Sequence, residues 1–528
     1  MDFSLKKYLF FLLFLSLNIV FSQFKDEFIN GVLLDSKTNE PVVFATIRVE
    51  DKALGVISNQ DGGFRVPTTF QLEGTILEIS SMGYETKRIP FSVLTTGGIN
   101  TILMTAAVFE LNETTVTAKA KRLTARKIIK YALERIPDNY PQDPFSIIGY
   151  YRDYQLKQRE YVNLNEAIVQ VYDVGFQSDD YQQISYGLFS YTKNKKFEID
   201  SFAAKPYDYI SQDKFIPDAA LISDYGGNEL VILHIHDAIR NHNVPAYSFV
   251  GKMTEDFIGQ HRFSKVETTA YNGEEVYKIG IRKSPFPFQV RGFIYIDKND
   301  YAIRRLDYAV YKKHVGTEGN FSEKIRDRKV LLYEISVEYA DIEQKMYLNY
   351  ISFHNKFVIR RPAKFKIEKL ILDKVNGLLE VQLNKPAKNY DELKLKDIEL
   401  RFKGQQIQFR RIVSAAGKSL TLKLSDGASQ VALRNQLFSN TEKGVREKPF
   451  LQISTLIDEE NNLLDERKLE RLDQFREFFT QQVANEGIAF KDSLMLKTRP
   501  LYDTRQPMYP KKKRFDFWMN TPLKNVDQ

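Results

Sequence analysis

The sequence has no cysteine among its 528 residues. Disulfides and thiolate metal sites are therefore excluded, although disulfides commonly hold small exported domains together. Histidine occurs only six times and tryptophan once, as Trp518. Beyond residues 1–22, no run approaches the roughly 18 apolar residues of a membrane-spanning helix. The formal net charge of +8 is modest for this length and is spread along the chain, so it does not indicate nucleic-acid binding.

Residues 1–22 have the pattern of a signal peptide. Lys6 and Lys7 precede an uncharged apolar run from Tyr8 to Val20, and the small residue Ser22 follows. The run is shorter than the roughly 20 residues that a spanning helix requires. We therefore expect an exported protein of the periplasm or cell envelope, either free or associated with the outer membrane. An exported chain without cysteine is ordinary for a bacterial envelope protein.

Residues 23–118 alternate short apolar runs with turn residues. FINGVLL, VVFATIRV, TILEIS and NTILMT are β-like, and clusters such as Lys37–Pro41 and Met82–Gly83 separate them. Closely spaced strands with turn chemistry between them predict a small antiparallel β-sandwich.

The run Asp61–Gly63 invites three interpretations: a phosphate loop, an ion-binding loop or a turn. A phosphate loop opens a helix, but this run leads into Phe64–Val66, which alternates like a strand. A calcium loop needs several carboxylates, and Asp61 has only Asn59 nearby. Because Asp-Gly between apolar segments is a strong hairpin signal, we predict a turn with Gly62 at positive φ. Gly83 has the same predicted structural role.

The sandwich segment resembles the carboxypeptidase regulatory-like domain, a transthyretin-like β-sandwich. The resemblance covers about the first fifth of the chain. It implies a non-catalytic module, common at the N-termini of envelope proteins and outer-membrane transporters of the Bacteroidota, and it transfers no catalytic residue. The residues that match the family pattern are Gly31, Asp35, Asn39, Glu40, Pro41, Ala45, Gly55, Asp61, Gly62, Phe64, Ser81, Met82, Gly83 and Tyr84.

The pattern of the whole chain indicates a mostly β protein with accessory helices. We expect an N-terminal antiparallel β-sandwich followed by a large antiparallel curved sheet or half-barrel. In order, the predicted segments are a signal peptide (1–22), the sandwich (23–118), a connector helix (119–145), an antiparallel β meander or half-barrel (146–374), a small β unit (375–445), and a C-terminal helix with a tail (446–528).

The long middle segment alternates strongly in hydrophobicity. In VLLYEISVEYA, residues 330–340, large apolar side chains alternate with Glu334, Ser336 and Glu338, so one face is buried and the other is wet. Its strand order resembles the open half-barrel of periplasmic lipoprotein carriers. A helix predicted over Leu463–Val483 from an apolar stripe is one of two candidates to cover the apolar face, which we expect to stay partly open.

Candidate catalytic motifs are absent. Zinc carboxypeptidases place two ligands in His-x-x-Glu, and none of the six histidines has glutamate three residues later. The densest polar cluster is His234, His236 and His242. Apolar residues at helical spacing favour a helix here, in which His234 and His236 diverge, so we favour structural histidines and keep a metal site as the alternative. No catalytic residue and no cofactor is predicted.

These patterns predict a non-catalytic, exported cell-envelope protein. Its regulatory-like domain would serve as an interaction module, and its β-rich region would bind an apolar, lipid-like ligand or an outer-membrane or periplasmic protein partner. Peripheral contact with a membrane is compatible with this function, and nucleic acid is not an expected partner. Two alternatives stay open: an outer-membrane transporter or barrel-associated component, and a metal-dependent hydrolase that uses the His234 cluster.

Overall fold

The computed structural model describes residues 28–50, 54–107, 123–178, 183–208, 210–217, 228–244, 250–313, 329–442, 449–484, 494–508 and 517–523. The predicted signal peptide and the basic run at 511–514 lie outside these ranges. The chain divides into two compact units: unit 1 comprises Met1–Ala204, Ile216–Phe357 and Leu472–Gln528, and unit 2 comprises Lys205–Phe215 and Val358–Arg471. Within the described ranges, no helix is both long and apolar enough to cross a membrane.

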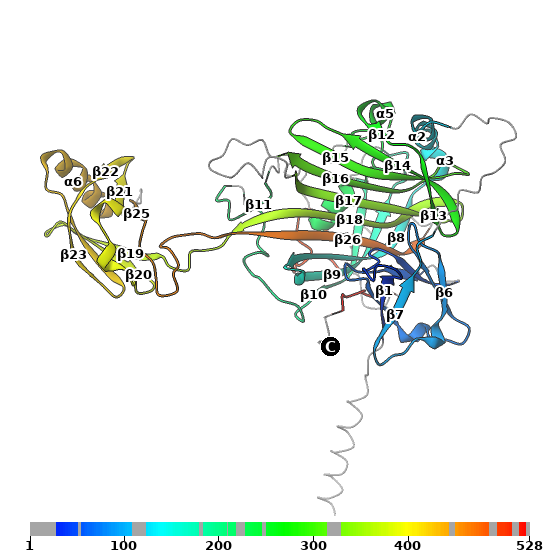
Figure 1. The fold of residues 1–528 in the computed structure, drawn as a ribbon, viewed down its shortest axis with the longest axis horizontal. Coiled ribbons are helices and arrows are strands. Elements are labelled where there is room, and N and C mark those ends of the chain that lie inside the picture. The colour runs from blue at the N-terminus through cyan, green and yellow to red at the C-terminus, as the bar shows by residue number, and fades with distance from the viewer. Residues whose placement is uncertain are drawn as a thin grey trace, which may run out of the picture. The chain divides into compact units, whose positions relative to one another are not determined.

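The N-terminal part of unit 1 is the predicted β-sandwich, except that one strand pair, Asn30–Asp35 with Ile99–Met104, is parallel and not antiparallel. One sheet has the order β4-β1-β7 and the other β3-β2-β5-β6. Figure 1 labels β1, β6 and β7 of this part, drawn in blue. Side chains from both sheets, including Ile29, Ile47, Phe64 and Ile79, are buried in the core between them. The strands are β1 (Phe28–Asp35), β2 (Thr46–Val49), β3 (Leu54–Ile57), β4 (Gly63–Pro67), β5 (Ile76–Ser80), β6 (Lys87–Pro90) and β7 (Ile99–Met104).

The predicted turn residues are confirmed. Gly62 has φ +73° and Gly83 has φ +86°, in the region that glycine tolerates best. The Gly62 amide donates to the Asn59 carbonyl at 2.9 Å, and Asp61 Oδ1 accepts from the Gly63 amide at 2.9 Å. Asp61–Gly63 is therefore a turn that leads directly into β4.

Replacing Gly62 by alanine is expected to destabilise unit 1. A Cβ at this position would lie 2.4 Å from the Leu33 carbonyl oxygen. Together with the cost of about 1–2 kcal/mol for a left-handed backbone, this clash lowers the free energy of unfolding by about 2 kcal/mol or more. Denaturant unfolding followed by fluorescence of Trp518 measures the loss. Gly98→Ala is the matched control, because Gly98 has open space around it; equal stability of the two variants would contradict the assignment.

A large antiparallel sheet forms the rest of unit 1. Its strand order is β10-β9-β8-β26-β18-β17-β16-β15-β14-β12, and β13 also pairs with β14. The strands are β8 (Phe145–Lys157), β9 (Glu160–Asp173), β10 (Ser185–Lys193), β12 (Arg262–Phe263), β13 (Glu267–Tyr271), β14 (Glu274–Lys283), β15 (Phe288–Asp297), β16 (Ile303–Lys313), β17 (Lys329–Ile342), β18 (Lys345–Arg360) and β26 (Leu469–Ala484).

The apolar face of this sheet is covered, contrary to the expectation of a partly open apolar cavity. Leu306, Tyr308, Ile335 and Val337 are all buried in one core. Side chains of helices α2, α4 and α5 contribute to that core and cover these apolar side chains in the part of the chain that the structure describes. The helices are α2 (Ala125–Glu134), which is the predicted connector helix, α3 (Ile136–Asn139), α4 (Glu229–Ile235) and α5 (Glu255–Gln260).

The helix predicted over Leu463–Val483 is wrong, because this segment forms β26. The strand lies between β8 and β18 and is buried on both faces from Leu472 to Gln481 except at Asp473 (Figure 1). Arg476 and Glu477 are polar yet buried, since ion pairs and hydrogen bonds satisfy them. In the sequence, these charged residues look like the solvated face of a helix. That both faces of the strand are covered becomes evident only from the neighbouring strands.

Unit 2 has a core of its own around Leu379, Leu400, Leu422 and Leu437. It contains the predicted small β unit but extends beyond residues 375–445 at both ends. One sheet has the order β19-β20-β24-β23 and another β22-β21-β25. The elements are β11 (Lys214–Phe215), which pairs with the end of β18, β19 (Ile367–Asp373), β20 (Leu378–Leu383), β21 (Ile398–Phe402), β22 (Gln405–Ile407), β23 (Phe409–Ala416), β24 (Ser419–Leu424), α6 (Ala428–Glu442) and β25 (Phe450–Ile453).

Candidate functional site

A cleft of about 700 Å³ lies on the polar face of the large sheet, opposite the apolar core. Its floor is formed by alternate residues of neighbouring strands, because side chains of a strand point to opposite faces in turn. Phe44 and Gln60 of the sandwich line the same cleft. The floor includes Arg282, Arg291, Phe293, Arg305, Asp307, Glu334, Ser336, Ser352, His354 and Phe475.

The wall residue Phe44 has an unusual backbone. Its φ is +59°, which is uncommon for a bulky residue. The ring lies 5.5 Å from that of Tyr350 on β18, measured between centroids, and the amide donates to the Ser58 carbonyl at 3.2 Å. These contacts hold the sandwich wall against the sheet at the cleft, where a strained residue is a common accompaniment of a binding site.

His354 on β18 is held between two carboxylates. Its Nδ1 lies 2.9 Å from Glu334 Oε1 and its Nε2 lies 2.7 Å from Asp473 Oδ1. The ring stacks on Phe475 with 4.2 Å between centroids. Burial lowers the pKa of His354, but its hydrogen bonds to Asp473 and Glu334 outweigh burial and raise the pKa above its ordinary value. Both ring nitrogens thus face carboxylate oxygens, and neither is directed at a ligand as a free acceptor.

The middle of the cleft floor is a chain of paired polar groups. Arg305 Nε donates to Asp307 Oδ1 at 2.9 Å, and the Ser336 hydroxyl donates to the same oxygen at 2.7 Å. Arg305 also lies 3.5 Å from Glu338, a carboxylate buried beneath the sandwich. Burial raises the pKa of Glu338, although Arg305 and hydrogen bonds from Asn349 and Tyr271 oppose the shift. The middle of the floor is therefore polar, with one arginine shared between two carboxylates.

The predicted histidine cluster lies elsewhere, in the core under the apolar face. His234 Nδ1 donates to the Leu230 carbonyl at 3.1 Å within α4. The ring of His236 stacks on Phe353 at 4.4 Å, and that of His242 faces Phe176 at 6.5 Å. Among the residues that the structure describes, no group of three histidine, aspartate or glutamate side chains is arranged to hold a metal ion.

The burial of His236 has a consequence for acid stability. Burial, with a contribution from the charge of Arg476, lowers the pKa of His236 from 6.5 to about 3. A lowered histidine pKa means that stability is complete above pH 6.5 and is lost as the pH falls, because only the unfolded chain takes up the proton. His236→Leu is therefore expected to gain about 2 kcal/mol of unfolding free energy relative to wild type between pH 7 and pH 5.

Urea unfolding at the two pH values measures this change, and the packing cost of the substitution cancels in the comparison. His354→Gln is a control with the opposite sign. Because the pKa of His354 is raised, its contribution to stability grows as the pH falls to about 6.5, so the deficit of the variant increases on acidification. A His236→Leu variant with the same acid sensitivity as wild type would contradict the buried neutral state.

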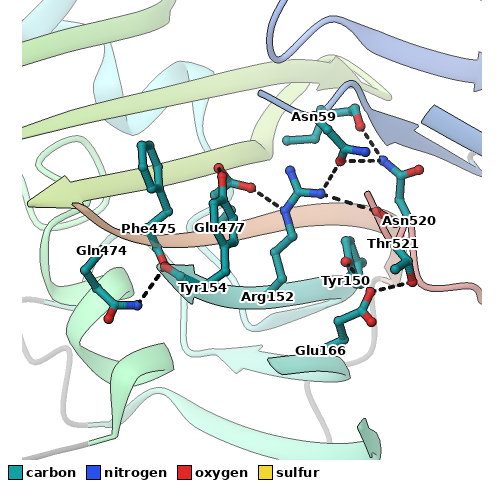
Figure 2. A network of polar contacts seen from close by, with 11 residues as sticks. Asn59, Tyr150, Arg152, Tyr154, Glu166, Gln474, Phe475, Glu477, Asn520 and Thr521 are labelled. Carbon is teal, nitrogen blue, oxygen red and sulfur yellow. Dashed lines mark hydrogen bonds and ion pairs between the residues drawn. The ribbon is translucent and has the colours of Figure 1, made fainter. Parts of the chain in front are cut away.

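A second polar site joins the sandwich, the sheet and the C-terminal segment (Figure 2). We call Arg152, Glu477, Tyr154, Asn59 and Asn520 the junction cluster. The guanidinium of Arg152 pairs with Glu477 and donates to Asn59 Oδ1, and its Nη1 lies 3.3 Å from the Asn520 carbonyl oxygen. The Tyr154 hydroxyl donates to Glu477 at 2.8 Å, and Asn520 Nδ2 donates to the Ile57 carbonyl at 2.6 Å.

The C-terminal segment, residues 517–523, makes further contacts with the sandwich. The Trp518 indole donates to the Arg65 carbonyl at 2.9 Å, and the Arg65 guanidinium donates to the Met519 carbonyl and the Thr521 hydroxyl at 2.7 and 2.6 Å. Thr521 donates in turn to Glu166, which also accepts from Tyr150 (Figure 2). The junction cluster and these contacts therefore attach the C-terminal segment to the sandwich and to the large sheet.

Neither the cleft nor the junction cluster was predicted from the sequence as a site. The predicted polar face of Glu334, Ser336 and Glu338 lies opposite the core, but Glu338 is buried and not wet. The cleft itself depends on the approach of Phe44 and Gln60 from 200 or more residues away. The junction cluster had a usable signal: YYRDY and QFREFF each place charges inside strongly aromatic runs. A charge in such a run indicates a buried partner.

The sandwich that walls the cleft also carries a family match. Residues 29–116 match the model of the CarboxypepD_reg-like domain. No curated protein matches the chain, and no solved structure does. The match agrees with the resemblance seen in the turn and strand residues, and it contains both cleft residues of the sandwich, Phe44 and Gln60. The chain thus carries a member of the CarboxypepD_reg-like domain family at residues 29–116.

Proposed function

We propose that this is an exported, non-catalytic protein of the cell envelope that binds a polypeptide partner, from the periplasm or the outer membrane, in the cleft of unit 1. The single observation that carries the proposal is that the CarboxypepD_reg-like domain and the large sheet line one cleft of about 700 Å³. A concave site between two domains is the usual location for a bound molecule. Export is proposed from the signal-peptide pattern of residues 1–22.

The chemistry of the floor favours a polypeptide over a lipid-like ligand. The hydroxyls of Ser336 and Ser352 and the paired charges around Asp307 offer hydrogen bonds to a peptide backbone. Phe293, which is 42% exposed, gives an apolar contact within this polar surface. By contrast, the apolar side chains that could hold an acyl chain are packed inside the core on the other face.

Two features of the floor support binding without catalysis. Both ring nitrogens of His354 face carboxylate oxygens, of Glu334 and Asp473, so neither nitrogen is free to accept a proton from a ligand. The Ser336 hydroxyl donates to Asp307 Oδ1, the carboxylate oxygen that also accepts from Arg305 Nε. These side chains position a ligand but supply no activated nucleophile.

The test is site-specific photocrosslinking in the native host. We would replace Phe293 in the cleft by p-benzoyl-phenylalanine and, as a control, Leu103 on β7, which is 44% exposed and outside the cleft. We expect a discrete, protease-sensitive adduct from position 293 and none from position 103. Adducts at both positions, no adduct, or an adduct that resists protease but yields to lipid extraction would contradict the proposal.

Fractionation tests the proposed location. The full chain should be recovered with the envelope after cell disruption and should be released by carbonate, because binding through the cleft is peripheral. Recovery with the cytosol would contradict export, and retention after carbonate would favour an integral membrane component instead.

A further inference from the structure

Three arginines stand side by side at one end of the cleft. Arg262 on β12 is directly opposite Arg282 on β14, and Arg282 is directly opposite Arg291 on β15. All three side chains are exposed, and Arg282 and Arg291 line the cleft. We call Arg262, Arg282 and Arg291 the arginine row.

This arrangement is unfavourable for the isolated protein. Directly opposite residues of antiparallel strands have Cβ atoms about 5 Å apart, and like charges there destabilise a sheet. Within the described ranges, no carboxylate forms an ion pair with any member of the row. Arg305 lies on the same face of the sheet, on the neighbouring strand β16. It differs from the row because it forms ion pairs with Asp307 and Glu338. The arginine in the middle of the cleft therefore has carboxylate partners within the sheet, whereas the charges of the arginine row are not neutralised by ion pairs.

We propose that the arginine row is the docking site for an acidic segment of the polypeptide partner. This inference rests on the proposed function and names the chemistry of its ligand. A guanidinium binds a carboxylate through two parallel hydrogen bonds, which makes arginine better suited to this role than lysine. Two carboxylates on alternate residues of an extended peptide stand about 7 Å apart, which flexible arginines on strands about 4.8 Å apart can reach.

The rest of the cleft explains why a short acidic segment fits better than a polyanion. Glu334 and Asp307 lie on the same floor and would repel a ligand that carried negative charge along its whole length. A peptide with its acidic residues over the row would instead extend across Ser336 and Ser352. The exposed ring of Phe293 lies two residues from Arg291 on the same face and offers an apolar contact beside the bound carboxylates.

The test measures binding of a labelled peptide to the mature full-length protein. The probe contains two aspartates that flank a phenylalanine, and its counterpart has asparagines in their place. We expect wild type to bind the aspartate peptide at least tenfold more tightly than the asparagine peptide at low ionic strength. Arg282→Ala with Arg291→Ala should abolish this preference without lowering the melting temperature, since it removes a repulsion.

Lys195→Ala with Lys196→Ala is the matched control, because it removes two exposed positive charges outside the cleft. This variant should keep the tenfold preference. Equal preference in the two double variants, or no preference in wild type, would overturn the inference. Inorganic phosphate and phosphatidylglycerol vesicles form the other arms: binding of either through the arginine row in place of the peptide would also overturn it.

Photocrosslinking from position 293 separates this inference from the proposed function. If the peptide preference is absent but position 293 still captures a polypeptide, the acidic docking site is wrong and the proposed function stands. If crosslinking captures no polypeptide, the proposed function fails first, and the acidic docking site fails with it.

Discussion

Replacing Glu477 by alanine is expected to lower the free energy of unfolding by about 3–5 kcal/mol, the cost of breaking a buried ion pair. The side chains of Arg152 and Glu477 are only 1% and 2% exposed. Without Glu477, the Arg152 guanidinium keeps a charge in the core with no counter-ion, and the Tyr154 hydroxyl loses its acceptor. Chemical denaturation followed by fluorescence of the single tryptophan measures the loss close to the junction cluster.

A surface ion pair provides the comparison. Lys298 lies 2.5 Å from Glu275, whose side chain is 51% exposed, so Glu275→Ala should cost less than about 1 kcal/mol. Combining Arg152→Met with Glu477→Leu should recover part of the loss, because an apolar pair leaves no buried charge. A Glu477→Ala variant as stable as Glu275→Ala would show that the junction cluster is hydrated or open in solution.

Replacing Trp518 by alanine is the second change with a large expected effect. The ring is 5% exposed and packs in the sandwich core, with 5.5 Å between its centroid and that of Phe70. Truncating a buried tryptophan typically costs about 3–5 kcal/mol. Since the same segment carries Asn520 into the junction cluster, the loss should lie at the upper end of this range. Circular dichroism during urea unfolding is the measurement, because the variant has no tryptophan.

Tyr502→Ala serves as the control, since Tyr502 is 58% exposed and lies in the chain shortly before the same segment. Trp518→Phe should cost less than Trp518→Ala, because it keeps most of the packing and loses the hydrogen bond to Arg65. If Trp518→Ala and Tyr502→Ala were equally stable, the C-terminal segment would be a surface tail and not part of the core.

Local patterns predicted much of the fold. The sandwich, its Gly62 and Gly83 turns, the connector helix at Ala125–Glu134 and the alternation of β17 all follow from short-range chemistry: turn residues, capping by Thr124 and a period of two. These features need no knowledge of distant residues, which is why sequence reasoning found them.

The features that were missed depend on partners far along the chain. The stripe at Leu469, Leu472, Phe475 and Phe479 suits a helix, and only pairing with β8 makes it a central strand. Likewise, the alternation of β17 does not identify the helices that cover its apolar face. Nor does it indicate that the sandwich packs over its polar face. The candidate site was therefore predicted as a polar surface but not as a cleft.

The place of β26 in the sheet sets the order in which the protein can fold. This strand separates β8 from β18, yet Arg152 on β8 and Glu477 on β26 are 325 residues apart in the sequence. At about 5–20 residues per second, synthesis of that stretch takes on the order of tens of seconds. During this time β8 has an unpaired edge that can template aggregation, and β18, which ends at Arg360, has one from its own synthesis until β26 is made. We expect the nascent chain to depend on a chaperone until its last strand arrives.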